Sequence, residues 1–511
     1  MSKSLMPLMC GLLVATGLTA CSESSDTSTS SAAAPESQSA PATVAVDNTI
    51  GDVVNTPLGA VRGESVTEVG ATARIYKGLP YAIPPTGDLR WKAPQPPQAW
   101  DGERDGTVWP NRCPQGESSM GAGGPISEDC LYLNVVTTAE KTNANHPVMV
   151  FFHGGGLTSG TGNSTTYNHP KLPSKGVVVV TVNSRLGPIG YLSHPALTAE
   201  DPNGSSGNYG TLDLKASLEW VQQNIKSFGG NPNNVTIFGE SGGGTKTISQ
   251  MATPLTKGLF HRAIVQSGSA LVSPERITPL DKAEERGQKL AAALGIEEGE
   301  NVLAELRAKP WQDIIAAGAK EEVGFRAGVV VEGYVIPEPV SDIFVKGKQH
   351  QVPLIVGANA GERSLQSSVP LMADLHSATG TPTFTYNFTQ LPKQWREEEG
   401  CVAFHGLELT YVFGAVPIGL SSRTTQFLAR SGGCSAQVPE HDEEDLKAAD
   451  QLATVWAQFA KTGNPSVEGI IDWPAYTKDA NNYADLGMPL TAKTGIQDSY
   501  TAPPESAGSR F

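Results

Sequence analysis

The sequence predicts an α/β protein in which a large, mostly parallel central sheet is flanked by helices and carries cap or loop insertions. Short apolar runs at residues 148–152, 234–238 and 352–356 have the length and composition of buried strands, and each runs into a turn that contains glycine. An amphipathic pattern typical of a helix covers residues 212–228, before the second run, and residues 245–251 after it contain no proline or glycine. The 511 residues are many for one domain, but α/β proteins with one large sheet reach this size as a single unit.

The turn after the run at residues 234–238 has the sequence Gly-Glu-Ser-Gly-Gly, at residues 239–243, and fits the pattern G-x-S-x-G. In this pattern a serine stands on a sharp turn between a strand and a helix, where its hydroxyl is exposed to a substrate. The alternative is an ordinary glycine-rich turn, but such a turn does not need the strand and helix signals that flank this one. Ser241 is therefore predicted to be a nucleophile.

A serine hydroxyl becomes an effective nucleophile only when a base removes its proton and a third group orients that base. The run at residues 352–356 continues into Gly-Ala-Asn-Ala-Gly-Glu, so that Glu362 follows a strand end, where the orienting acid is expected. A solvated surface carboxylate is the alternative interpretation of Glu362, and Asp374 is the next candidate for the acid.

The base is expected after the acid in the chain. His405 fits this order, because it precedes a glycine at the entry to an apolar segment. Three competing histidines lack a following glycine: His350, His376 and His441. His405 is therefore the predicted base.

The run at residues 148–152 is followed by His153 and by three glycines at residues 154–156. Backbone N–H groups of such a glycine loop stabilise the negative oxygen that forms when a nucleophile attacks a carbonyl. Glycine suits the position because no Cβ blocks the approach of the backbone to the substrate. We expect His153 to hold the loop and not to bind a metal.

Several motifs, in one order along most of the chain, resemble those of the type B carboxylesterases and cholinesterases, a family that includes bacterial para-nitrobenzyl esterases. They lie at residues 77–85, 89–91, 127–134, 153–156, 183–188, 207–210, 228–232, 239–243, 266–268 and 456–465. The resemblance implies an α/β-hydrolase fold and a serine carboxylesterase that hydrolyses small-molecule esters through an acyl-enzyme, without a cofactor or metal. Short-to-medium-chain esters, or bulky and aromatic ones, are the expected substrates. The alternatives are a non-catalytic surface binding protein, or a lipase or amidase with the same triad.

Carried over to this sequence, the resemblance implies a triad of Ser241, Glu362 and His405. It also implies that the oxyanion is bound by the backbone amides of Gly155, Gly156 and Gly242. Ser267 resembles a serine that supports the triad in relatives, and a plain serine at a strand end is an equal alternative.

Three departures from the family pattern concern the shape of the site. Leu157 replaces an aromatic residue and Gly242 replaces an alanine, so we expect both exchanges to remove volume beside the oxyanion hole. The segment between Glu362 and His405 is shorter than in most relatives. We therefore expect a more open site, unless another insertion covers it.

Six cysteines occur in the chain, and Cys10 lies in the expected signal segment. By the resemblance, Cys113 and Cys130 form a disulfide loop, which leaves Cys401 and Cys434 as the second pair. The loop between Cys401 and Cys434 encloses the predicted base. We therefore expect this bridge to hold the segment that carries His405.

The N-terminal part of the chain resembles a bacterial lipoprotein signal. Residues 1–20 contain a lysine and a short apolar run, and Leu-Thr-Ala-Cys at residues 18–21 fits a lipobox, which makes Cys21 the expected lipidation site. Residues 21–46 are rich in Ser, Ala, Pro and Thr and are expected to be a flexible tether before a catalytic domain at residues 47–511. The sequence thus predicts an exported protein on the periplasmic side or surface of a Gram-negative outer membrane, which contacts the membrane only through this anchor.

The formal net charge is -15, which argues against binding to nucleic acids, because their phosphates need lysine and arginine partners. The acidic residues in the cluster at 441–445 are expected to be the solvated start of a helix.

Overall fold

A computed structural model describes residues 48–68, 70–116, 123–268, 271, 277–365 and 368–499. The chain divides into two units, Met1–Asp47 and Asn48–Phe511, and every described residue belongs to the second. The expected signal segment, the lipidation site Cys21 and the tether at residues 21–46 lie outside the described residues. In the described part of the chain, none of the helices has the length and apolar character needed to cross a membrane.

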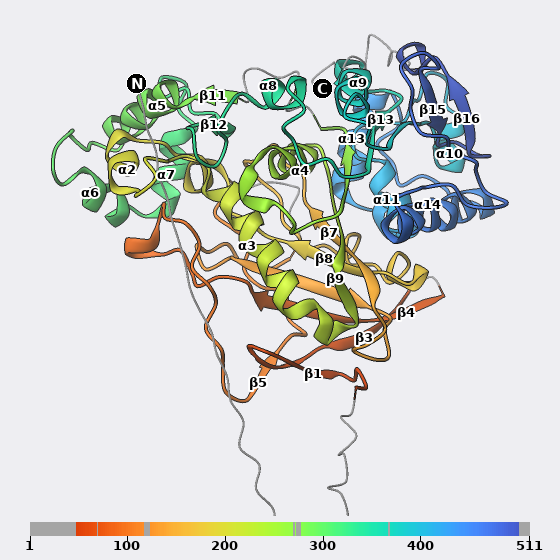
Figure 1. The fold of residues 1–511 in the computed structure, drawn as a ribbon, viewed down its shortest axis with the longest axis horizontal. Helices are drawn as coiled ribbons and strands as arrows, with labels where there is room; N and C mark the ends of the chain where they lie inside the picture. Colours follow the sequence, from red (N-terminus) through yellow and green to blue (C-terminus); the bar gives the residue numbers. More distant parts are fainter. Residues whose placement is uncertain are drawn as a thin grey trace, which may run out of the picture. The chain divides into compact units, whose positions relative to one another are not determined.

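The described residues form a main sheet of eleven strands, in the order β16-β15-β14-β13-β10-β9-β7-β8-β6-β4-β3 (Figure 1). The strands from β8 to β15 pair in parallel, whereas β3, β4 and β6 at one side and β16 at the other pair antiparallel. The sheet is thus large and mostly parallel, as the sequence predicts. Its strands are β3 (Glu64–Glu68), β4 (Ala71–Pro80), β6 (Tyr132–Thr137), β7 (His146–Phe152), β8 (Val178–Val182), β9 (Gly230–Glu240), β10 (Arg262–Gln266), β13 (Leu354–Asn359), β14 (Thr383–Phe388), β15 (Asn482–Asp485) and β16 (Thr491–Thr494).

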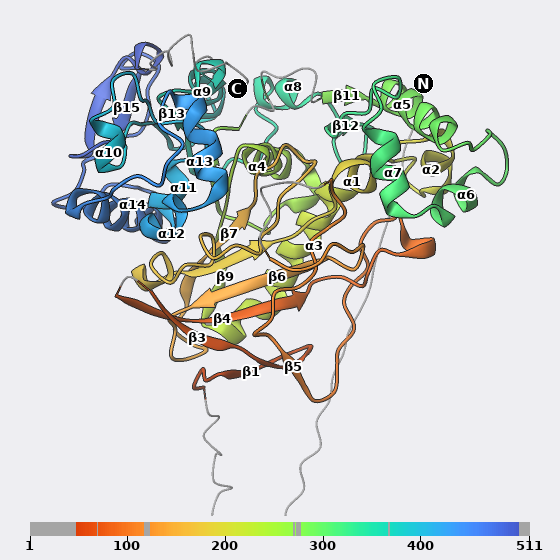
Figure 2. The same cartoon turned by 180° about the vertical axis from the view of Figure 1, so that it is seen from behind.

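Successive residues of the central strands point to opposite faces of the sheet. Both faces carry buried apolar side chains, and helices cover both. Val150 of β7 packs in a core with helices α3 (Tyr209–Asn224) and α4 (Gly242–Ala252). Its neighbour Phe151 packs in a second core with α11 (Glu408–Val412) and α14 (Glu443–Thr462). Helix α3 accordingly lies in front of the central strands in Figure 1 and behind them in Figure 2.

The three predicted strands are confirmed, with small shifts of their ends. Residues 148–152 and 234–238 lie inside β7 and β9, and the third run starts later, because β13 begins after Pro353. The helix predicted at residues 212–228 is α3, which passes into a 3₁₀ turn at Ile225–Phe228.

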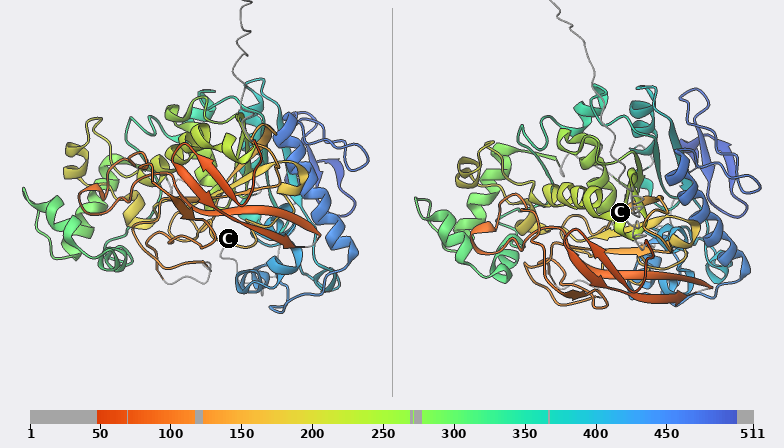
Figure 3. Two further views of the ribbon diagram at one scale, coloured as in Figure 1. Left: turned by 90° about the horizontal axis from the view of Figure 1, so that it is seen from below. Right: turned by 60° about the horizontal axis from the view of Figure 1, so that its bottom comes forward.

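The remaining elements extend the unit at its edges and ends. A small sheet contains β1 (Val53–Thr56), β2 (Gly59–Arg62) and β5 (Glu103–Asp105), and a further pair contains β11 (Ile277–Pro279) and β12 (Val329–Val331). The other helices are α1 (Gly187–Tyr191), α2 (Pro195–Glu200), α5 (Leu280–Ala293), α6 (Val302–Ala308), α7 (Trp311–Gly318), α8 (Val340–Val345), α9 (Ser368–Ser377), α10 (Lys393–Arg396), α12 (Val416–Leu420) and α13 (Arg423–Ala429). Helices α5, α6 and α7 form the green end at the left of both views in Figure 3, and they share an apolar cluster with residues of α1 and α2.

The structure contains both disulfide bonds that the sequence analysis expects. Cys113 is bonded to Cys130, and Cys401 is bonded to Cys434. The second bond joins the segment before His405 to the chain just after α13, so that it closes a loop around the predicted base.

Candidate active site

Ser241 stands on a sharp turn between strand β9 and helix α4. Its backbone has φ 58 and ψ -122, a conformation that a residue with a side chain adopts only when its surroundings hold it there. The Ser241 N–H donates to the carbonyl of Gln266 over 2.9 Å, and the Ser241 carbonyl accepts from Thr245 N–H over 3.0 Å. A Cβ on Gly243 would lie 1.9 Å from the carbonyl oxygen of Phe152, so the elbow packs against the end of β7 with room only for glycine.

Glu362 lies three residues beyond the end of β13, and only 2% of its surface is exposed. Its Oε2 atom accepts from the backbone N–H of Asn359 over 2.6 Å and from the hydroxyl of Ser267 over 2.7 Å. Its Oε1 atom is paired with Nδ1 of His405. Glu362 is therefore a buried and fully engaged carboxylate, not a solvated one, and Ser267 contacts it directly.

His405 lies in the loop before α11, and neighbouring backbone groups hold this loop on the end of β13. The Phe404 carbonyl accepts from the Asn359 side-chain amide over 2.7 Å, and the Ala403 carbonyl accepts from Gly361 N–H over 2.9 Å. Nε2 of His405 lies 3.1 Å from Oε1 of Glu240, the residue before Ser241. The ring therefore connects Glu362 on one side to the nucleophile elbow on the other.

The alternative acid and bases are engaged elsewhere. Asp374, on α9, accepts from the Tyr476 hydroxyl over 2.8 Å and pairs with Lys478 over 3.2 Å. Nε2 of His350 lies 2.8 Å from the Thr253 carbonyl, and Nε2 of His376 lies 2.9 Å from the Val352 carbonyl. His441 is exposed and precedes α14.

Two further glutamates, which the sequence analysis does not single out, surround the His405 ring. Glu240 is 5% exposed, and Glu408, in the first turn of α11, is 1% exposed. Glu408 accepts from the Gln266 amide over 3.1 Å and from the Asn359 amide over 2.6 Å. The sequence contains a signal for both glutamates, since one directly precedes Ser241 and the other lies three positions after His405.

Burial and nearby charges shift the pKa values of Glu240, Glu408 and the His405 imidazole. Burial raises the pKa of Glu240 to about 7, and burial together with the charge of Glu240 raises the pKa of Glu408 to about 8. Burial opposes the charged form of His405, but the carboxylates of Glu240 and Glu362 outweigh it and raise the pKa of His405 to about 10. The site therefore stabilises a positive charge on the imidazole.

The glycine loop lies against the elbow. Gly155 has φ 94 and Gly156 has φ 60, so both adopt left-handed conformations that glycine reaches without strain. The Gly155 carbonyl accepts from the N–H groups of Thr158 and Ser159 over 3.0 and 3.1 Å. A Cβ on Gly242 would lie 2.5 Å from the Gly156 nitrogen, which shows that the predicted donors lie close together.

The same contact changes the interpretation of Gly242. The expectation that glycine at this position removes volume beside the oxyanion hole is wrong, because the backbone of the loop at Gly156 takes up the space that an alanine methyl would need. Leu157, in turn, is 1% exposed and packs with Tyr191 and Ala327.

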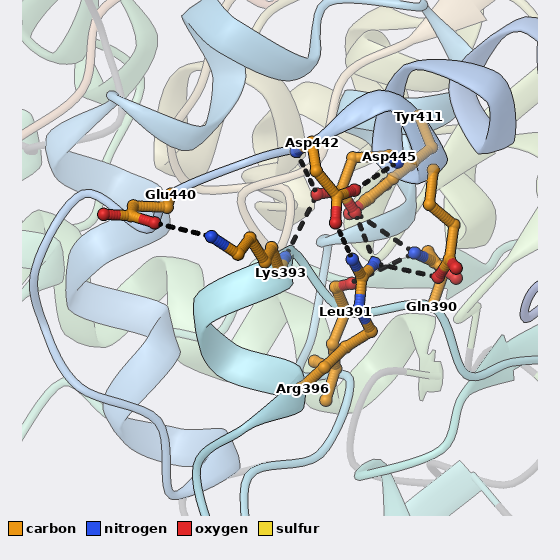
Figure 4. A network of polar contacts seen from close by, with 9 residues as sticks. Gln390, Leu391, Lys393, Arg396, Tyr411, Glu440, Asp442 and Asp445 are labelled. Atoms are coloured by element: carbon orange, nitrogen blue, oxygen red, sulfur yellow. Dashed lines mark hydrogen bonds and ion pairs between the residues drawn. The ribbon is translucent and has the colours of Figure 1, made fainter.

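Helix α11, which follows His405, is anchored by a polar network (Figure 4). Asp445, in the first turn of α14, is fully buried and accepts from Arg396 over 2.8 Å and from the Tyr411 hydroxyl of α11 over 3.3 Å. Asp442 and Asp445 also form a capping box at the start of α14. The expectation of a helix start at this acidic cluster is correct. The expectation that its acidic residues are solvated is wrong for Asp445, whose side chain lies in the interior and is paired with the half-buried Arg396.

In the described part of the chain, no group of three or more His, Cys, Asp or Glu residues has an arrangement suited to a metal ion.

A serine elbow at the carboxyl end of a parallel strand, in a sheet of this topology, defines an α/β-hydrolase. Residues 51–369 and 363–502 match the Carboxylesterase family. The chain therefore belongs to the carboxylesterase family and is a carboxylic ester hydrolase.

Similar proteins come from bacteria and animals. The fumonisin B1 esterase of Sphingopyxis macrogoltabida is 33% identical, over 83% of this chain and 85% of its own length. The para-nitrobenzyl esterase of Bacillus subtilis is 31% identical, over 86% of this chain and 95% of its own length. The cocaine esterase of Oryctolagus cuniculus is also 31% identical, over 85% of this chain and 92% of its own length.

Proposed function

We propose that this esterase cleaves its substrates through a triad of Ser241, His405 and Glu362 and a covalent acyl-enzyme. The observation that supports this assignment best is the position of His405, whose Nδ1 is paired with buried Glu362 and whose Nε2 faces the elbow that carries Ser241. Nδ1 and Nε2 have the separate tasks that acyl transfer requires, since one is fixed by the acid while the other exchanges protons with the reacting groups.

The reaction proceeds in two acyl-transfer steps. His405 Nε2 accepts the Ser241 hydroxyl proton as the oxygen attacks the ester carbonyl, and the imidazolium then donates that proton to the departing alcohol. The N–H groups of Gly155, Gly156 and Gly242 bind the negative carbonyl oxygen in each tetrahedral intermediate. Water activated by the same imidazole then releases the carboxylic acid and restores Ser241.

We propose short-to-medium-chain esters, or bulky and aromatic ones, as the substrate class. Two similar proteins are named for para-nitrobenzyl and cocaine, which supports a site that accepts aromatic esters. The short segment between Glu362 and His405 supports an open site, because less chain is available to wall it.

The test is the initial rate of hydrolysis of para-nitrophenyl acetate, butyrate, octanoate and palmitate by the purified protein and by Ser241→Ala. We expect the highest rates on the short esters and a loss of at least about a thousandfold in the variant. Ser421→Ala, at an exposed serine, is the matched control and should keep the full rate. Turnover that survives in Ser241→Ala would assign the nucleophile to another residue, and a folded wild-type protein inactive on every ester would support an amidase or a binding protein.

We also propose that the protein is exported and held at a Gram-negative outer membrane by a lipid on Cys21, on the strength of the lipobox at residues 18–21. The wild-type chain expressed in a Gram-negative host should incorporate radiolabelled palmitate and partition into detergent, whereas Cys21→Ser should do neither. Equal labelling of the two proteins, or none in either, would contradict the proposal.

A further inference from the structure

Lys246 is a buried lysine that the proposed reaction does not use. It lies in the second turn of α4, five residues after the nucleophile, and 1% of its surface is exposed. Among the described residues, no carboxylate lies within ion-pair distance of its amine. A buried amine destabilises the folded protein unless it forms hydrogen bonds, and the amine of Lys246 makes two such contacts.

Both contacts of Lys246 are with His153, the first residue of the glycine loop. Its Nζ donates to the His153 carbonyl over 3.1 Å and lies 3.3 Å from Nε2 of the His153 ring. The other ring nitrogen, Nδ1, lies 2.8 Å from the carbonyl oxygen of Gly154. Since a carbonyl can only accept, Nδ1 carries the proton of this hydrogen bond.

The ring of His153 is neutral, because burial and the neighbouring Lys246 hold its pKa well below the ordinary value. With the proton on Nδ1, the Nε2 atom is an acceptor, and the lysine amine is its donor. The hydrogen bonds therefore run in one direction, from Lys246 through the His153 ring to the Gly154 carbonyl.

The Gly154 carbonyl belongs to the same peptide unit as the N–H of Gly155, which is a proposed oxyanion donor. In a planar trans peptide the carbonyl and the N–H point in opposite directions, so that holding the carbonyl fixes the direction of the N–H. The Gly154–Gly155 peptide has little room to rotate, because Gly160 packs against it. A Cβ on Gly160 would lie 2.4 Å from His153 Nδ1 and 2.7 Å from the Gly154 oxygen.

We propose that Lys246 is a positioning residue for ester hydrolysis: acting through His153, it holds the Gly154–Gly155 peptide so that the Gly155 N–H points at the oxyanion. This role rests on the proposed function of the glycine loop. Lys246 does not touch the substrate, and its effect passes entirely through the His153 ring and backbone.

The charge of Lys246 is not essential to this role. Burial lowers the pKa of Lys246 to about 7, although Asp213 opposes the shift. A neutral amine still has two N–H groups, which is the number that the contacts with His153 require. A side chain without any donor is therefore the decisive substitution.

The experiment compares Lys246→Met with Gln250→Met. Gln250 is equally buried on the same helix, but its amide donates to the Thr211 carbonyl of α3 over 3.0 Å and does not contact the glycine loop. We expect kcat for para-nitrophenyl butyrate to fall about 10- to 100-fold in Lys246→Met with little change in KM, because an oxyanion donor acts mainly in the transition state. Gln250→Met should change kcat by less than about threefold, with only a lower melting temperature.

A second readout separates positioning from a general loss of structure. A trifluoromethyl ketone that adds to the serine mimics the tetrahedral intermediate, and its inhibition constant should rise in Lys246→Met by about the same factor as kcat/KM falls. Lys246→Gln, which keeps a donor, should recover part of both losses, and it also serves if the methionine variant does not fold.

Full kcat and unchanged ketone affinity in a folded Lys246 variant would overturn the inference, as would equal losses in Gln250→Met. These outcomes are distinct from a failure of the proposed function, in which the wild-type protein itself would show no turnover dependent on Ser241.

Discussion

The two sides of the candidate active site are built by different physical means. On the oxyanion side, the groups expected to act are backbone N–H groups, fixed by glycine conformations and by close contacts such as that between Gly242 and Gly156. On the histidine side, the acting groups are side chains, and three buried carboxylates set the protonation of His405. The positions of the oxyanion donors therefore depend on the volume of neighbouring groups, whereas the protonation of His405 depends on neighbouring charges.

This division follows from what each side must do. An oxyanion needs donors that already point at it, and a backbone can be held still only by steric contact and hydrogen bonds. A proton carrier must instead change its charge during the reaction, and nearby charges are the means to adjust its pKa. Substitutions that change volume or charge alone should therefore affect the two sides differently.

The largest effect is expected when the histidine side loses the charge of Glu362. In Glu362→Gln the shape is kept, but the amide neither stabilises the imidazolium nor fixes the tautomer of His405, so kcat should fall by about a thousandfold or more. The measurement is kcat for para-nitrophenyl butyrate, beside the melting temperature. Asp374→Asn, at the other candidate acid, is the matched control and should remain active; the reverse result would transfer the acid role to Asp374.

The oxyanion side should respond to a single added methyl group. In Gly242→Ala the new Cβ meets the Gly156 nitrogen at 2.5 Å, so the glycine loop must shift, and we expect kcat to fall about 10- to 100-fold with KM changed little. Steady-state kinetics on para-nitrophenyl butyrate would measure both constants. Gly299→Ala is the control, because nothing lies within 4 Å of a Cβ at that exposed glycine. Full activity in Gly242→Ala would show that the loop has more freedom than the contact indicates.

The disulfide around His405 tests whether the histidine side also needs mechanical support. Replacing Cys401 and Cys434 by alanine should lower the free energy of unfolding by about 3 kcal/mol and should reduce kcat several-fold, because the loop that carries His405 is less constrained. Denaturant unfolding and kcat are measured together. The matched variant replaces Cys113 and Cys130, whose bond should affect stability more than kcat. A change in stability alone in both variants would remove any role of the Cys401–Cys434 bond in positioning the base.

Much of this site is predictable because its elements follow local patterns. The strands before Ser241 and Glu362 are short apolar runs, and the sharp turns after them require glycine. The sequence therefore indicates both positions. The disulfide pairing of Cys113 with Cys130 is likewise carried by a family motif at that position.

The rest depends on contacts between segments that are distant in the chain. Asp445 is expected to be solvated from the sequence, because its partner Arg396 is far away in the chain and only the fold buries Asp445 beside it. Lys246 and His153 are 93 positions apart, and no local pattern connects them. From the sequence, Gly242 is expected to leave free volume beside the oxyanion hole, but in the fold the backbone of Gly156 fills that space.

The smallest effect concerns the pH dependence of the histidine side. The neutral imidazole is the active base, so a raised pKa of His405, at about 10, places the rise of kcat/KM on the alkaline side of neutrality. In Glu240→Gln one of the charges that raise this pKa is removed, so the neutral base forms at lower pH and the rise should shift downwards by about one pH unit.

Glu240 is charged only above its pKa of about 7. The pKa of His405 is higher, so Glu240 is charged over the pH range in which the imidazole titrates. The pH profile of kcat/KM between pH 6 and 11 measures the shift, with exposed Glu440→Gln as the control for a change in total charge. The plateau rate should fall only a few-fold, because Glu362 still stabilises the imidazolium. A profile that does not move in Glu240→Gln would mean that Glu240 does not contribute to the protonation of His405, and that Glu362 and Glu408 set it without Glu240.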